Sequence, residues 1–220
     1  MEIDLKIITK INQTIDINIL ASNTKIQDEL RSYFKYFIDL NNSRQFTNQL
    51  HYLIEIELKL GNRDLNILNL ETKSGLFAYL ATQRGHQVTS IDYYFNLHEY
   101  NNLNEFTFMQ MRNYIYLQIQ KIFNIDYTSL ELIDMQPIAV DNGPFDLIFS
   151  YDYSLHEPAP PDRHIPWTKS YWEYFINETM NKIADHGLLF IVIENNDEFC
   201  LLYTSPSPRD QRGSRMPSSA

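Results

Sequence analysis

The chain has 220 residues, with 28 acidic and 18 basic side chains and a net charge of −10 at pH 7. Such an acidic surface disfavours a nucleic-acid partner, because phosphate binding needs clustered Lys and Arg. One cysteine allows no disulfide within the chain, and no apolar run approaches the roughly 18 residues of a transmembrane helix. We therefore expect a cytoplasmic protein that binds neither nucleic acid nor membrane; the sequence does not indicate its oligomeric state.

Residues 200–220 differ in character from the rest of the chain. Cys200 to Asp210, CLLYTSPSPRD, resembles the in-frame translation of a sequencing-library adapter, and Ser214 to Ala220 resembles the downstream end of that adapter. A natural Ser/Pro-rich tail is the alternative, but translated scars are excluded from fold reasoning. We expect three parts: an N-terminal helical segment (1–61), an α/β domain truncated at its C-terminal end (62–199) and a non-native tail (200–220).

The N-terminal segment carries two helix patterns. Thr24 and Gln27 form a capping box, and the apolar residues that follow recur at helical spacing. A second helix is expected after Thr47, with Gly61 in the position of its C-terminal cap. Residues 1–20 alternate isoleucines with polar residues, which is compatible with a strand or a helix.

From Leu65 the apolar pattern predicts strands alternating with helices. The predicted strands are 66–70, 87–91, 130–133, 145–150 and 188–193, and the predicted helices are 75–84, 101–123 and 172–183. A turn is expected at 185–187. The last strand, LLFIVI, is a near-continuous apolar run of the kind found at the centre of a parallel sheet. The alternation indicates a doubly wound, mostly parallel α/β sheet.

Residues 65–92 have the pattern of the first half of a nucleotide-binding βαβ unit. Gly75 is the only expected glycine present in its turn, because Glu71 and Lys73 occupy the positions of the other two. Further landmarks follow in order: Asp92, Asp134-Met135, Phe145 to Ile148, Pro166 to Glu173 (PWTKSYWE), His186 to Leu189 and Glu194-Asn195. Together they resemble the class I S-adenosylmethionine-dependent methyltransferases, a Rossmann-like family.

The resemblance implies S-adenosylmethionine as cofactor and a set of residues around it. Those residues are Asn69, Glu71, Thr72, Ser74 and Gly75 in the first turn, then Asp92, Tyr93, Asp134, Met135 and Ser150. Asp92 would accept the ribose hydroxyls, as acids at this position do in nucleotide folds, or it would simply cap a turn. Asp134 would accept from the adenine amino group with Met135 against the ring, or it would be a solvated loop acid.

The resemblance also implies methyl transfer to a small-molecule or glycan-like acceptor. His156 is the first candidate for a general base because its ordinary pKa is near neutrality; Asp152 is the second and Glu194 the third. Tyr151, Tyr153 and Trp167 would wall an acceptor pocket or pack in the core. We expect no metal, because the acid spacing matches no metal-binding loop. A non-catalytic binding or partner module is the alternative function, since two glycines are replaced.

Overall fold

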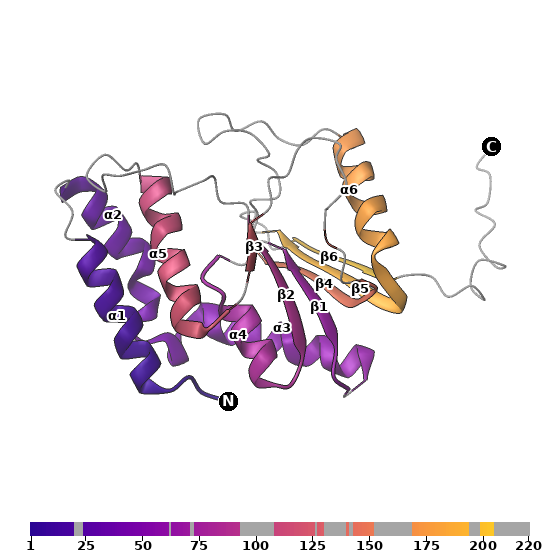
Figure 1. Ribbon diagram of the computed structural model, residues 1–220, viewed down its shortest axis with the longest axis horizontal. Helices are drawn as coiled ribbons and strands as arrows, with labels where there is room; N and C mark the ends of the chain where they lie inside the picture. Colours follow the sequence, from indigo (N-terminus) through magenta and orange to yellow (C-terminus); the bar gives the residue numbers. More distant parts are fainter. Residues whose placement is uncertain are drawn as a thin grey trace.

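A computed structural model describes residues 1–19, 24–61, 63–70, 73–92, 108–125, 127–129, 140, 143–151, 169–193 and 199–204. A six-stranded sheet forms its centre (Figure 1). The strands are β1 (Asn66–Leu70), β2 (Gln87–Asp92), β3 (Tyr127–Ser129), β4 (Phe145–Tyr151), β5 (Ile183–Ile193) and β6 (Phe199–Thr204). Their order is β3-β2-β1-β4-β5-β6, and all neighbours pair in parallel except β5 and β6, which are antiparallel. This is the predicted doubly wound, mostly parallel α/β fold.

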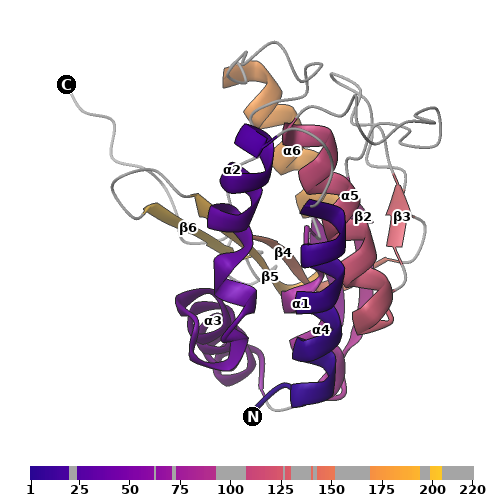
Figure 2. The same cartoon turned by 90° about the vertical axis from the view of Figure 1, so that its left-hand side faces the viewer.

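Six α-helices and two short 3-10 helices surround the sheet in the part of the chain that the structure describes. They are α1 (Leu5–Ile19), α2 (Thr24–Phe34), η1 (Lys35–Phe37), η2 (Leu40–Asn42), α3 (Arg44–Leu60), α4 (Leu76–Gln83), α5 (Phe108–Phe123) and α6 (Lys169–Asn181). Helices α1, α2 and α5 lie side by side (Figures 1 and 2). The ambiguous N-terminal stretch is thus helical, and it packs on a helix that follows β2. Among the described helices, none combines the length and hydrophobicity needed to cross a bilayer.

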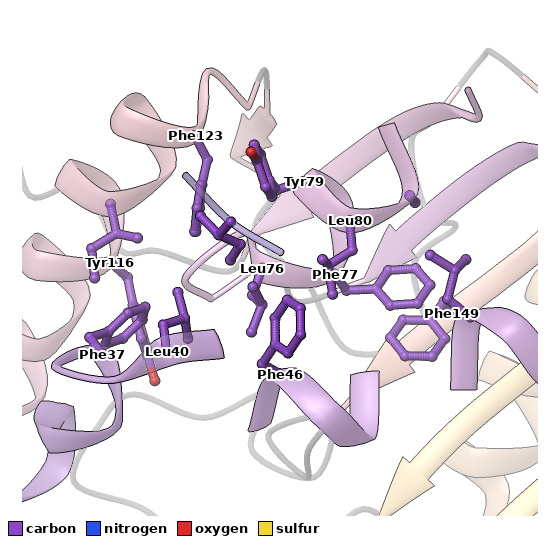
Figure 3. Close-up of a cluster of buried hydrophobic side chains, with 14 of the residues drawn as sticks. Phe37, Leu40, Phe46, Leu76, Phe77, Tyr79, Leu80, Tyr116, Phe123 and Phe149 are labelled. Carbon is purple, nitrogen blue, oxygen red and sulfur yellow. The ribbon is translucent and has the colours of Figure 1, made fainter. Parts of the chain in front are cut away.

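The hydrophobic core has two parts, one on each face of the sheet. The larger joins the N-terminal helices, α4 and α5 to one face of the strands (Figure 3). Within it, Phe77 of α4 stacks on Phe149 of β4 with ring centroids 3.5 Å apart and planes 8° apart. The smaller part packs Phe175, Ile176 and Met180 of α6 against the other face. Because both faces are covered, β1 is buried along almost its whole length.

Several helix and strand ends differ from the predictions. Helix α3 begins at Arg44, earlier than expected, because the Ser43 side chain caps it by accepting a hydrogen bond from the backbone N–H of Phe46 at 3.1 Å. The third strand is found at Tyr127–Ser129, whereas the predicted 130–133 lies outside the described residues. The predicted turn at 185–187 is a register irregularity inside β5, so this strand begins at Ile183.

Part of the predicted C-terminal tail takes part in the sheet. Residues 200–204, expected to lie outside the domain, form most of β6 and pair antiparallel with the apolar strand β5. The physical reason is that β5 would otherwise leave a row of unpaired backbone groups on this side, and any extended segment within reach can satisfy them. The sheet therefore extends past residue 199, while the non-native origin of the tail stays a prediction.

Candidate functional site

The carboxyl ends of the parallel strands define the candidate site. From β1 the chain proceeds to β2 and β3 on one side of the sheet, and β4 and β5 then lie on the other side of β1. The order of the strands therefore reverses between β1 and β4. In open α/β sheets, ligands bind in the crevice outside the carboxyl ends of the strands at such a reversal. Leu70 of β1 is in register with Ser150 of β4 there, close to the ends of both strands.

In the described part of the turn that follows β1, two residues have left-handed backbones, and only one of them is a glycine. Lys73 has φ +45° and Gly75 has φ +77°, both in the left-handed region. For a lysine this conformation costs about 1–2 kcal/mol. The carbonyl of Gly75 accepts the backbone N–H of Tyr79 at 2.8 Å, which starts α4. Glu71 and Thr72 lie outside the described residues.

Gly75 serves packing at this position. A Cβ on Gly75 would lie 3.1 Å from Cγ1 of Ile125 and 3.3 Å from Cγ of Gln120, both in or just after α5. The missing side chain therefore lets the end of α5 approach the turn. Ser74, another predicted cofactor residue, is likewise buried. The retained glycine thus faces protein atoms, which is the role of helix–strand packing that one glycine of such turns commonly has.

Gln120 contacts the turn from the other side and was not predicted. Its side-chain amide Nε2 donates a hydrogen bond to the backbone carbonyl of Lys73, and the whole side chain is buried. A net gain of about 0.5–1.5 kcal/mol is typical of such a bond, which is comparable to the cost of the left-handed lysine. The signal available in the sequence was a polar residue on the apolar face of α5, beside Ile119 and Tyr116.

Buried polar side chains lie close to the edge on both faces of the sheet. Asn69 of β1 and Ser90 of β2 are in register, and both are buried. Among the described residues, the hydroxyl groups of Ser90 and Ser150 have no hydrogen-bond partner. Buried polar atoms almost always find a partner in the protein, in water or in a ligand. The Ser150 hydroxyl, on the last-but-one residue of β4, is therefore a fitting contact for a polar ligand at the reversal of strand order.

The other predicted site residues are only partly described. Asp92 is the last residue of β2 and pairs with Ser129 of β3, which brings its backbone to the same edge; its side chain is not described. Tyr93, Asp134, Met135, Asp152, His156 and Glu194 lie outside the described residues, as do Tyr153 and Trp167. In the parts of the chain that are described, no cluster of His, Cys, Asp or Glu could hold a metal ion.

Tyr151 packs against the helical layer. Its hydroxyl donates to Oε1 of Gln45 at 3.0 Å, and its ring centroid is 6.0 Å from that of Tyr52 on α3. Of the two interpretations of this residue, core packing is the one that the contacts support. Tyr151 therefore ties the end of β4 to α3.

A charged cluster around the buried carboxylate of Glu57 lies at the opposite edge of the sheet. Glu57 of α3 accepts from Arg84 at 2.6 Å (Nε) and 2.5 Å (Nη2), and from Nε2 of His86 at 2.8 Å. The other ring nitrogen of His86, Nδ1, accepts the backbone N–H of Leu65 at 3.2 Å, so Nε2 is the nitrogen that donates to Glu57. Burial opposes ionisation of Glu57, but the hydrogen bonds from Arg84 and His86 outweigh it and lower the pKa of the carboxyl. The cluster joins α3 to the start of β1 and β2.

Comparison with known proteins finds similarity in structure alone. No protein-family model and no curated protein sequence matches the chain. An amino pentose methyltransferase from Micromonospora echinaspora, solved with S-adenosylmethionine bound, matches with a TM-score of 0.48 and 9% identity over 72% of this chain and 55% of its own. An S-adenosylmethionine-dependent methyltransferase from Clostridium acetobutylicum matches with a TM-score of 0.47 and 10% identity, over 76% and 57%.

A ribosomal protein L11 methylase from Lactobacillus delbrueckii is also similar, with a TM-score of 0.41 and 15% identity over 70% of this chain and 62% of its own. The chain thus spans between 55% and 62% of the length of these three solved proteins. The likeness is one of fold.

Proposed function

We propose that this protein transfers a methyl group from S-adenosylmethionine to a small-molecule or glycan-like acceptor. The observation that carries the proposal is the reversal of strand order between β1 and β4. This reversal lies beside the turn after β1 and beside the end of β2. In the motif that resembles the methyltransferases, these two places hold the cofactor turn and the acid Asp92. The cofactor, when bound, would supply an activated methyl group on a sulfonium.

The residues at this edge fit such a group in different ways. Ser150 offers a buried hydroxyl that no described residue satisfies, and Asn69 is a second buried polar side chain close to the end of its strand. Asp92 ends β2, where a carboxylate can accept both ribose hydroxyls. Glu71, Thr72, Ser74, Gly75, Tyr93, Asp134 and Met135 complete the proposed cofactor set.

Methyl transfer from a sulfonium depends mainly on alignment of donor and acceptor. A base is needed only when the acceptor carries a proton that must leave. His156 remains our first proposal for that base and Asp152 the second. In the sequence both follow β4, whose carboxyl end lies at the edge where the acceptor would meet the cofactor.

Binding of S-adenosylmethionine, measured by calorimetry and by thermal shift, tests the proposal. We expect Asp92→Asn to weaken binding by about tenfold or more, since a hydrogen bond to a charged group contributes about 1.5–3 kcal/mol. Asp185→Asn is the matched control, because Asp185 is exposed near the amino end of β5. This control should bind as the unchanged protein does.

A non-catalytic binding module is the second candidate function. The observation that favours it is Gly75, whose missing side chain accommodates α5. If the unchanged protein gives no heat and no thermal shift at millimolar S-adenosylmethionine, the enzymatic proposal is wrong and the module remains.

A further inference from the structure

The turn after β1 is held by a helix that lies far away in the sequence. Gln120 is 47 residues from Lys73, yet its amide donates to the carbonyl of that residue. The Gln120 side chain is fully buried, so the bond is shielded from water. Lys73 is the one non-glycine residue with a positive φ in the described part of this turn. The bond therefore acts on the residue whose conformation is hardest to maintain.

A second contact also joins the turn after β1 to α5. The space in front of Gly75 is occupied by Ile125 and by the Gln120 side chain itself. Ile125 is positioned by the end of α5, where its backbone N–H bonds to the carbonyl of Gln120 at 3.0 Å. Hence the end of α5 contacts the turn at both Lys73 and Gly75. These are the two described residues of the turn that have left-handed backbones.

We propose that Gln120 is a positioning residue, which holds the turn after β1 in the conformation that receives the cofactor. The inference rests on the proposed function. In a turn with several glycines, the backbone is free to adopt the conformation that approaches the ligand closely. Here the bulkier lysine is held in place before the ligand arrives, and such preorganisation raises affinity by lowering the cost of ordering the turn.

Three substitutions separate this role from a general effect on packing. Gln120→Leu keeps a buried side chain of similar length but removes the donor. Gln120→Glu gives a carboxylic acid that can donate to the Lys73 carbonyl when protonated and that repels it when ionised; burial raises the pKa of such a group. Gln118→Leu is the control, since Gln118 lies on the same helix but is only half-buried.

The first readout is hydrogen exchange of a peptide covering residues 73–79 in the ligand-free protein. Gln120→Leu should exchange several-fold faster there, while Gln118→Leu should match the unchanged protein. Equal exchange in Gln120→Leu and the unchanged protein would overturn the proposal. This readout does not depend on cofactor binding.

The second readout is the affinity for S-adenosylmethionine across pH. We expect Gln120→Leu to bind about tenfold more weakly at every pH, given the usual worth of a hydrogen bond. Gln120→Glu should bind like the unchanged protein at low pH and lose affinity as its carboxyl ionises. Faster exchange with unchanged affinity would refute the positioning role. Absence of binding by the unchanged protein would instead refute the proposed function and, with it, the link to a cofactor.

Discussion

The buried carboxylate of Glu57 provides a sharp test of how α3 is attached to the sheet. The Glu57 side chain is 7% exposed and accepts three hydrogen bonds, two from Arg84 and one from His86. In Glu57→Gln the amide can still accept from one partner, but its NH₂ group faces donors of Arg84. The substitution therefore leaves the Arg84 guanidinium without the negative charge of the Glu57 carboxylate.

The magnitude follows from how deeply that guanidinium is buried. Removing one partner of a buried ion pair typically costs about 3–5 kcal/mol. The Arg84 side chain is 34% exposed, so water can hydrate part of the orphaned charge. We therefore expect the lower end, a loss of about 3 kcal/mol in the free energy of unfolding. With an m-value of about 2 kcal/mol/M, the urea midpoint should fall by about 1.5 M.

Urea unfolding followed by circular dichroism measures this loss at pH 7. Glu55→Gln is the matched control on the same helix, because its carboxylate is 49% exposed and lies 3.9 Å from His51; it should change stability by less than about 0.5 kcal/mol. Adding Arg84→Met to Glu57→Gln removes the orphaned charge and should recover part of the loss. If Glu57→Gln matches the control, the cluster does not anchor α3.

Three other predictions concern pH and packing. The pKa of Glu57 is lowered from 4.5 on folding, so its stabilisation is present above that pH; the difference between the unchanged protein and Glu57→Gln should therefore shrink as pH falls through the folded pKa. Gly75→Ala should destabilise more than Gly61→Ala in thermal melts, because both have positive φ but nothing lies within 4 Å of Gly61. Phe149→Ala removes the ring that stacks on Phe77 and should cost about 3–5 kcal/mol by urea unfolding; a loss below about 1 kcal/mol would contradict the packing shown here.

Much of the fold was predictable from local patterns. The βαβ unit was predicted at nearly the right residues. Its signals depend only on neighbouring residues: the apolar run at 66–70, the glycine at 75 and the apolar helix that follows. The apolar run at 188–193 likewise predicted the buried part of β5. Its earlier start at Ile183 was missed because the turn residues 185–187 are accommodated as an irregularity within the strand.

Local sequence by itself determined the alternation of strands and helices, the turn after β1 and the acid at the end of β2, because hydrophobic periodicity and glycine placement act over a few neighbouring residues. Only the tertiary structure decided that Gln120 supports Lys73, that Gly75 accommodates α5, and that Glu57 pairs with Arg84 and His86. These contacts join residues between 27 and 50 positions apart, and nothing in either segment alone specifies its partner. The packing of helices on the sheet brings them together, and burial then makes each unpaired polar group costly enough for the pairing to matter.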